Sequence, residues 1–278
     1  YEQKKLWRIF AVWAILKGIH LPTWIELQET PTRRIKGRFD KLNKIRKFRE
    51  SIPDWMDLIG LEELGEDQWG KELASLNKMA PVIIRANTLK TNVKELQQTL
   101  ISEDIITEKI NGHPDALKLK ERTNLFLKDS FQNGLYEVQD ASSQLVAPFL
   151  KIKPGMKICD ICAGAGGKTL HLSSLSENKG QIIAMDIYNN KLLELKRRAK
   201  RNGAFNIETK AIENNKSFKR LYGKIDRLLI DSPCSGLGVL KRNPDSKWKL
   251  SSDFIETIKN TQQEILQKYA PLINNNGK

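Results

Sequence analysis

Residues 157–169 read KICDICAGAGGKT, an apolar strand that runs into a glycine-rich loop and then into a helix. Such a loop lets the backbone approach a ligand closely and points the first N–H groups of the helix at it. After this stretch, strand-like and helix-like segments alternate, at 181–186, 190–203, 206–212, 226–231 and 254–272. The alternation predicts an α/β fold, in which a Rossmann-like parallel sheet is joined by crossover helices.

The spacing of the glycines separates three kinds of nucleotide loop. A Walker A loop would need glycine where Cys162 stands, and a nicotinamide-binding loop would need it where Thr169 stands. The looser glycine loop of a methyl-donor site fits better. Asp186 ends the next strand, 22 positions after Gly164; a carboxylate there can bind both ribose hydroxyls or cap the following helix. Glu213 follows the strand at 206–212 and could accept from an adenine amino group.

The cysteine content limits the redox and metal chemistry. Cys159, Cys162 and Cys234 are too few for a disulfide framework. The first two have a thioredoxin-like or zinc-like spacing, but no second cysteine or histidine pair lies near enough in sequence to complete a tetrahedral set. We therefore expect no metal and a reducing, cytoplasmic compartment. The apolar run at 9–16 falls short of the ~20 residues of a membrane span, so we expect no membrane partner.

The charge balance points to an anionic partner. Lys and Arg number 47 against 33 Asp and Glu, which gives a net charge of +14 and a pI of about 9.6. Such a surface favours nucleic acid, because Lys and Arg contacts to phosphates release counterions. The densest positive charge lies at 33–50, RRIKGRFDKLNKIRKFRE. A solvated helix face is the alternative to RNA or DNA contact there, but such faces normally mix the two signs.

The sequence divides into three regions. Residues 1–79 have a helical pattern and form a basic N-terminal region. Residues 80–138 combine strands at 82–87, 106–110 and 115–122 with a helix at 92–104, which predicts a small α+β RNA-binding module. Residues 139–278 form the α/β domain.

Two further expectations concern the α/β domain. A helix should follow Asp140 as its N-cap, with Leu145, Val146, Phe149 and Leu150 as the apolar set. A sheet of only four strands would leave the strand at 226–231 on an edge, which natural proteins avoid for an apolar strand. We therefore expect an incomplete parallel sheet and a chain truncated at its C-terminus.

The candidate chemical site follows the strand at 226–231. That strand ends in Asp231 and runs into SPCSGLGVLKRNPDSKW at 232–248. In an open α/β sheet the ligand crevice lies beyond the carboxyl ends of the strands, so Asp231 and Cys234 belong over the same crevice as the glycine loop. Cys234 follows a proline in a loop with two glycines, which favours an accessible thiol over a half-buried inert one.

Four segments carry a resemblance to a known family: YEVQDASSQL at 136–145, DICAGAGGKT at 160–169, AMDI at 184–187 and DSPCSGLGVLKRNPDSKW at 231–248. From residue 80 to the end, the chain resembles the Sun family (Fmu, RsmB and Nop2) of RNA cytosine-C5 methyltransferases. The resemblance implies a Rossmann-like class I methyltransferase domain with S-adenosylmethionine as its cofactor.

The resemblance also implies which residues bind this cofactor. Asp186 holds the ribose, and Asp231 lies beside the cofactor and can bond the target cytosine. Glu213 takes the adenine position, where the family usually carries aspartate. Seven consecutive residues wrap the methionine part: Cys162, Ala163, Gly164, Ala165, Gly166, Gly167 and Lys168.

The implied reaction needs a cysteine nucleophile. C5 of cytosine is a poor nucleophile, so a thiolate first adds at C6; methyl transfer, loss of the C5 proton and elimination of the thiol follow. In this family the attacking thiol lies in a later Thr-Cys motif, which is absent from the 278 residues, while Cys234 matches the cysteine that assists release of methylated RNA. We therefore expect a monomeric RNA methyltransferase acting on 16S-type ribosomal RNA. The alternatives are attack by Cys234 itself and a non-catalytic RNA-binding protein that retains the fold.

Overall fold

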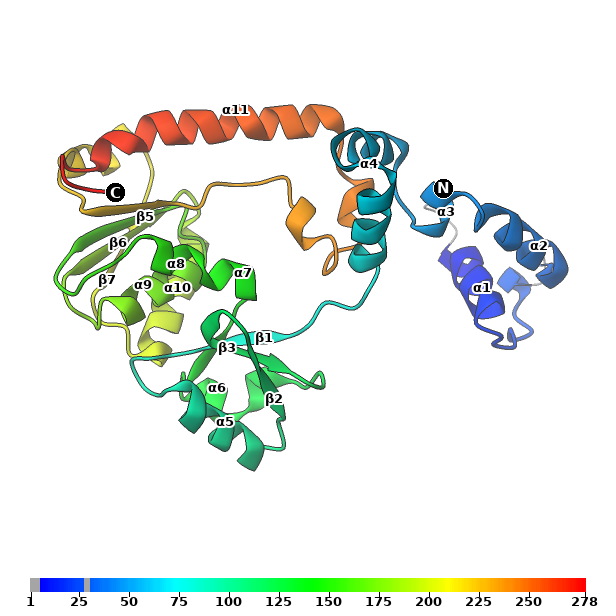
Figure 1. Ribbon diagram of the computed structural model, residues 1–278, viewed down its shortest axis with the longest axis horizontal. Coiled ribbons are helices and arrows are strands. Elements are labelled where there is room, and N and C mark those ends of the chain that lie inside the picture. Colours follow the sequence, from blue (N-terminus) through cyan, green and yellow to red (C-terminus); the bar gives the residue numbers. More distant parts are fainter. Residues whose placement is uncertain (1–5, 28–30) are drawn as a thin grey trace. The chain divides into compact units, whose positions relative to one another are not determined.

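A computed structural model describes residues 6–27 and 31–278 (Figure 1). The chain forms two compact units, the first from residues 1–79 with 236–252 and the second from residues 80–235 with 253–278. The chain thus leaves the second unit after Ser235, contributes a segment to the first, and returns at Asp253.

The second unit contains the predicted parallel sheet, with strand order β7-β6-β5-β8. Its strands are β5 (Lys157–Ile161), β6 (Gln181–Asp186), β7 (Ile207–Ala211) and β8 (Arg227–Ile230). The helices that follow them are α9 (Gly167–Leu175), α10 (Asn189–Asn202) and α11 (Ser252–Tyr269). All of these were predicted from the alternation of apolar runs and helical patterns, and the Rossmann-like fold is confirmed.

Successive residues of the strands pack on opposite faces of this sheet, as the two-residue period of a strand requires. Ala184 packs with Leu170 of α9 and Leu195 of α10. Its neighbours Ile183 and Met185 pack instead in a cluster that contains Tyr269 at the end of α11. Both faces are apolar and covered, which is typical of parallel sheets.

The outer edge of β8 is partly paired. Ile225 and Ile273 form a parallel bridge, and the N–H of Leu228 donates to the carbonyl of Lys278 (2.9 Å). Residues after α11 therefore pair beside β8, the strand that the sequence analysis expected to be left at an edge.

A second sheet, of strand order β2-β3-β1-β4, forms the predicted α+β module. The module comprises the strands β1 (Ile83–Ala86), β2 (Thr107–Ile110), β3 (His113–Leu119) and β4 (Tyr136–Val138), and the helix α5 (Val93–Ser102). Asn92 caps α5 by accepting from the N–H of Glu95 (3.0 Å), while Leu96 and Leu100 are fully buried against the sheet. The amphipathic helix and three of the strands are those predicted from the sequence.

Charged and polar groups join this module to the parallel-sheet domain. Glu137 of β4 is almost fully buried, and it accepts from Arg198 (2.7 Å), Arg201 and Asn202 (2.6 Å) of α10. Gly134 allows the close approach: its φ is +68°, and a Cβ there would lie 2.2 Å from the carbonyl oxygen of Arg201. The module is therefore fixed to the C-terminal end of α10.

In the described part of the N-terminal region predicted at 1–79, the helices are α1 (Leu6–Leu16), α2 (Thr32–Leu42), α3 (Arg46–Arg49) and α4 (Asp54–Leu76), as the helical pattern of the sequence indicated. The core of this unit includes Met56, Trp69 and Leu73 of α4, and Leu240 from the segment 236–252 packs into the same cluster. Asp57 organises its edge by accepting from Arg46 Nε (3.0 Å) and Trp69 Nε1 (2.8 Å). The motif segment after Cys234 thus belongs to a different core from the strand that precedes it.

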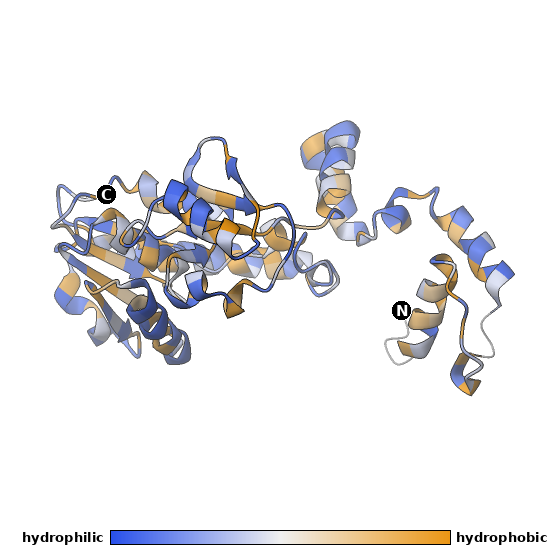
Figure 2. Cartoon of the chain, turned by 90° about the horizontal axis from the view of Figure 1, so that it is seen from below, coloured by the Kyte–Doolittle hydropathy of each residue, from blue (hydrophilic) through white to orange (hydrophobic). Residues whose placement is uncertain are grey.

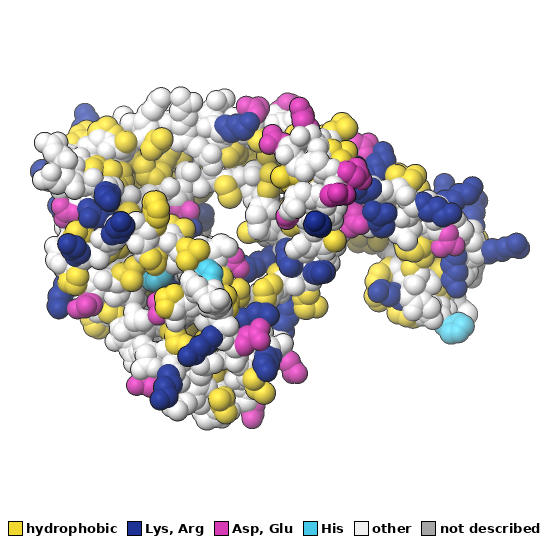
Figure 3. Space-filling view, viewed as in Figure 1, with side chains coloured by type: hydrophobic (Ala, Val, Ile, Leu, Met, Phe, Trp, Pro, Cys, Tyr) yellow, Lys and Arg dark blue, Asp and Glu magenta, His cyan; other side chains and the backbone are white. Residues whose placement is uncertain are grey.

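Hydrophilic and hydrophobic residues alternate along the helices (Figure 2). Helix α2 has no buried residue, and Lys and Arg side chains gather over the part of the chain that contains it (Figure 3). Across residues 6–27 and 31–278, no helix combines the length and apolarity needed to cross a membrane.

The prediction of one helix after Asp140 is wrong. Two four-residue helices form instead, α7 (Ala141–Gln144) and α8 (Val146–Phe149), and the side chain of Asp140 makes no cap bond to α7. Because the helix breaks at Leu145, the buried face differs from the predicted one. Leu150 is buried as expected, but Phe149 is 86% exposed and Leu145 is 50% exposed.

Replacing Glu137 with Gln is expected to lower the free energy of unfolding by about 2–4 kcal/mol, because two arginines would lose a buried carboxylate. Burial acts to raise the pKa of Glu137, but Arg198, Asn202 and Arg201 outweigh it and hold the pKa below its usual value. This contribution is therefore present above the unfolded-state pKa and disappears as the pH falls through the lower folded-state pKa. Urea unfolding at neutral and acidic pH measures both effects.

The control is Glu108→Gln, which removes an exposed ion pair with Lys118 on the same module and should change stability little. Equal losses in the two variants would contradict the assigned role of Glu137.

Candidate functional site

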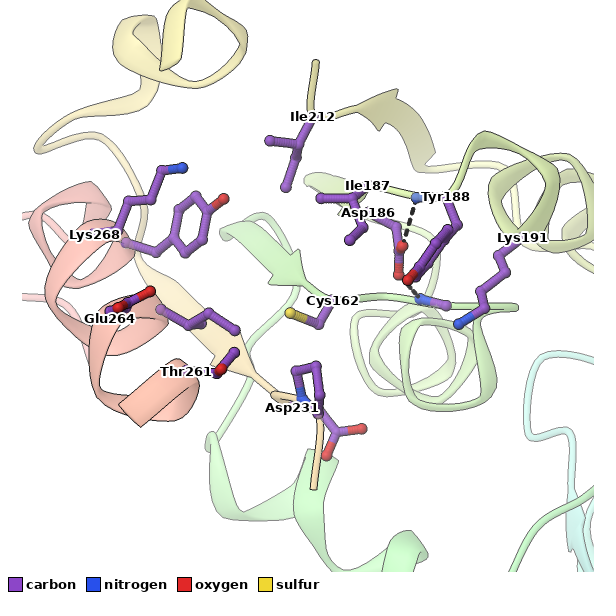
Figure 4. Close-up of a pocket in the computed structure, with 14 residues that line it drawn as sticks. Cys162, Asp186, Ile187, Tyr188, Lys191, Ile212, Asp231, Thr261, Glu264 and Lys268 are labelled. Atoms are coloured by element: carbon purple, nitrogen blue, oxygen red, sulfur yellow. Dashed lines mark hydrogen bonds between the residues drawn. The ribbon is translucent and has the colours of Figure 1, made fainter. Parts of the chain in front are cut away.

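A pocket of about 470 Å³ opens at the carboxyl ends of β5, β6 and β8 (Figure 4). Cys162 and Gly164 line it from the glycine loop, and Asp186 lines it from the end of β6. Asp231 and Pro233 line it from the segment after β8. Four of the sequence-predicted site residues therefore surround one cavity.

The backbone of the glycine loop is unusual at three positions. Cys162, Gly164 and Gly166 all have positive φ, of 68°, 54° and 86°. A Cβ at Gly166 would lie 2.5 Å from Leu195 Cγ, so only glycine fits between the loop and α10. The turn of the chain into α9 therefore depends on this glycine.

Asp186 ties the loop to the second strand. One carboxylate oxygen accepts from the N–H of Gly164 (2.7 Å), and the other accepts from the N–H of Tyr188 (2.8 Å). Asp186 is 5% exposed, yet it lines the pocket. Each oxygen keeps a further lone pair, so the carboxylate can also accept from a bound ligand. Asp186 is not the N-cap of α10, because that position is taken by Tyr188 and α10 has no side-chain cap bond. Ribose binding by Asp186 stays a prediction, for which the carboxylate faces the pocket.

The other loop residues shape its outer side. The carbonyl of Ala165 accepts from Arg198 (2.7 Å), and the carbonyl of Gly167 accepts from Arg85 of the module (3.1 Å). Ala163 packs against the apolar cluster beneath α9 and α10. These three residues hold the loop in place rather than line the pocket.

Lys168 and Asp231 form an ion pair. The pair joins the first turn of α9 to the segment after β8, so it fixes Asp231 at the pocket. The family resemblance assigned both residues to the cofactor site without predicting that they pair.

The cysteines differ in reactivity. Burial, followed by the nearby Asp186 charge, raises the pKa of Cys162 to about 11. Burial also raises the pKa of Cys159 to about 12. Both are therefore protonated at neutral pH and are poor nucleophiles. Cys234 is exposed, as predicted, and directly follows the pocket residue Pro233.

Glu213 lies next to the pocket in sequence but is exposed, and its neighbour Ile212 contributes to the lining instead. The structure therefore brings Cys162, Gly164, Asp186 and Asp231 together, while Glu213 lies outside the cavity wall.

One wall of the pocket was missed by the sequence analysis. It comes from α11 and consists of Thr261, Glu264, Ile265, Lys268 and Tyr269. The signal was available in the three- and four-residue spacing of these positions, which gives a helix one continuous face. Within the described ranges, no group of three His, Cys, Asp or Glu side chains could hold a metal ion.

Comparison with known proteins identifies the family. Residues 147–278 match the family described as 16S rRNA methyltransferase RsmB/F, and residues 52–125 match the ferredoxin-like domain of RsmF/B-like methyltransferases. The chain belongs to the RsmB/F methyltransferase family. This agrees with the resemblance found in the sequence motifs and with S-adenosylmethionine as the expected cofactor.

Several known proteins are similar to this chain. A probable ribosomal RNA small subunit methyltransferase B of Synechocystis sp. is 37% identical over 234 residues, which cover 82% of this chain and 51% of the relative. The corresponding Bacillus subtilis protein is 32% identical, over 81% of this chain and 49% of its own length. The chain thus spans about half the length of these relatives. The structure of a methyltransferase homologue from Pyrococcus horikoshii superposes with a TM-score of 0.72 at 25% identity, covering 86% of this chain and 74% of that one.

A buried carboxyl group lies on β5, the strand that leads into the glycine loop. Asp160 of β5 accepts from Thr169 Oγ1 (2.7 Å). Burial raises the pKa of Asp160 to about 7, and the charges of Asp231 and Asp186 act in the same direction. Ionised Asp160 therefore destabilises the folded chain.

We expect the free energy of unfolding to fall as the pH rises from about 4 to about 7, because only the unfolded state releases the Asp160 proton at low cost. Asp160→Asn should remove about 2–4 kcal/mol of this pH dependence. Urea unfolding of both proteins across this pH range gives the difference, in which groups common to both cancel. Parallel pH profiles would contradict the assignment.

Proposed function

We propose that this protein transfers the methyl group of S-adenosylmethionine to C5 of a cytosine in small-subunit ribosomal RNA. The observation that carries the proposal is the single pocket that Gly164, Asp186 and Asp231 share. Family membership and the printed names of the Synechocystis and Bacillus relatives support the choice of ribosomal RNA.

The pocket suits the proposed cofactor. Its volume of about 470 Å³ lies in the range of ligand sites. Asp186 would hold the ribose through its remaining lone pairs, and the apolar Ile187 and Ile212 would contact the adenine. When bound, S-adenosylmethionine supplies an electrophilic methyl group. The backbone of Gly164, fixed by Asp186, would define where the methionine part lies.

The acceptor site would lie beside Asp231. A cytosine inside an RNA helix is inaccessible there, so the base must be unstacked first. Asp231 would accept from the cytosine amino group, and its ion pair with Lys168 would keep it in position. The basic helix α2 and the α+β module would supply the contacts to RNA phosphates.

The cysteines have different roles in the proposed reaction. The reaction needs a thiolate at C6 of the base, and the raised pKa values of Cys159 and Cys162 make these thiols unsuitable. We assign the attack to a Thr-Cys cysteine encoded beyond Lys278 and the release of the methylated RNA to Cys234. A non-catalytic RNA-binding protein is the less favoured alternative, because it would have no use for the loop and the carboxylates around the pocket.

The cofactor site is tested by calorimetric titration of the 278-residue chain with S-adenosylmethionine. Asp186→Ala should weaken binding about tenfold or more, because it removes the ribose acceptor and frees the Gly164 N–H. Glu177→Ala, at an exposed carboxylate of the turn after α9, should leave binding unchanged. Glu213→Ala decides whether Glu213 reaches the adenine when the cofactor is bound. Equal affinity of the wild type and Asp186→Ala would refute the cofactor site.

The role of Cys234 is tested with an RNA that carries 5-fluorocytidine at the target position. With the Thr-Cys segment present, Cys234→Ala should still form a covalent protein–RNA adduct, visible on a denaturing gel. With unmodified RNA the same variant should accumulate this adduct, because release is slowed. The chain ending at Lys278 should form none. Loss of the adduct in Cys234→Ala would instead make Cys234 the attacking thiol, and absence of any methyl transfer would favour the RNA-binding alternative.

A further inference from the structure

The segment that carries Cys234 connects two different cores. Residues up to Ser235 belong to the unit with the pocket, and residues from Gly236 to Ser252 belong to the other compact unit. Cys234 therefore lies two residues from a point where the chain changes unit. Any displacement of the segment 236–252 would be transmitted directly to Cys234 unless the preceding residues are held.

Side chains from two helices hold those residues. Lys168 of α9 pairs with Asp231 at one end. At the other end, Gln262 of α11 donates from Nε2 to the carbonyl oxygen of Pro233, at 2.9 Å. That oxygen belongs to the peptide bond between Pro233 and Cys234, so a bond to it fixes the plane from which the Cys234 side chain starts.

The position of Gln262 on its helix supports a specific role. Its neighbour Thr261 lines the pocket, whereas Gln263 on its other side is exposed. Gln262 itself is half-buried between them. The ring of Pro233 restricts φ there, which leaves ψ of Pro233 as the backbone torsion that the Gln262 hydrogen bond to its carbonyl restrains.

We propose that Gln262 is a positioning residue that anchors the Pro233–Cys234 peptide to the cofactor-binding domain. The inference rests on the proposed function, in which Cys234 acts on the methylated RNA. Without this anchor, Cys234 would follow the movements of the segment 236–252 rather than stay at the pocket.

The anchor is tested by three substitutions on α11. Gln262→Leu removes the donor with little change in volume, and Gln262→Lys retains a donor on a side chain long enough to reach the carbonyl. Gln263→Leu makes the same apolar change at the adjacent exposed position and serves as the matched control. Equal melting temperatures would show that the helix is intact, and Gln262→Glu, which stays polar but cannot donate, replaces Gln262→Leu if that variant fails to fold.

The first measurement is the mobility of a nitroxide spin label on Cys234 of the 278-residue chain, read from its electron paramagnetic resonance spectrum. Cys234 is exposed, whereas Cys159 is buried and Cys162 is half-buried, so brief labelling should modify Cys234 first. Peptide mapping then checks which cysteine carries the label. We expect a clearly more mobile label in Gln262→Leu, and spectra like the wild type in Gln262→Lys and Gln263→Leu. A label equally mobile in Gln262→Leu and the control would overturn the proposal.

The second measurement is turnover of the protein with the Thr-Cys segment present. Gln262→Leu should lower kcat about fivefold, the equivalent of one hydrogen bond, while the affinity for S-adenosylmethionine stays within twofold of wild type. Lower cofactor affinity at unchanged kcat would mean that Gln262 supports the pocket wall and not Cys234. The spectra need neither RNA nor cofactor, so they test the anchor independently of the reaction. A protein that transfers no methyl group would refute the proposed function, and the spectra would still decide whether Gln262 holds Cys234.

Discussion

The carboxylate of Asp186 is the constraint on which the pocket depends. A glycine loop with positive φ at three positions has little intrinsic preference for one shape. By accepting from Gly164 and Tyr188 at once, Asp186 joins this loop to the end of the neighbouring strand. Asp231, in the segment after β8, is tied to the start of α9 by its ion pair with Lys168. Two carboxylates from different strand ends thus hold the glycine loop and the first turn of its helix.

The polar junction between the module and the parallel-sheet domain extends this constraint. Arg85 of β1 is almost fully buried, and it donates to Gln139 and to the carbonyl of Gly167 beside the loop. Burial lowers the pKa of Arg85 to about 10, which leaves it charged at neutral pH. A buried cation in this place is costly unless its hydrogen bonds are kept, so the module and the loop are held together as one unit.

Most of the fold followed from local sequence patterns. Apolar runs such as 157–161 and 181–186 predicted strands because both faces of a parallel sheet are buried. The pair of short helices at 141–149 did not follow, because the single helix was predicted to run through Pro148, which has no N–H to donate to the carbonyl of Gln144 and so breaks the helix near Leu145. The α11 wall was missed because the placement of Thr261 in the same pocket as Cys162 and Gly164, which are far away in sequence, is set by tertiary structure. For Glu213 the sequence predicted too much. Its position after β7 is suitable for an adenine contact, but its side chain is exposed.

The discontinuity of the first unit has a consequence for synthesis on the ribosome. Its core needs Leu240 from the segment 236–252, which is made after the whole α+β module and most of the parallel sheet. Domains usually fold in order as they emerge, but here the cluster of Met56 and Leu73 on α4 stays incomplete until a much later segment arrives. Helix α4 would therefore depend on a chaperone for longer than the elements that pack against their sequence neighbours.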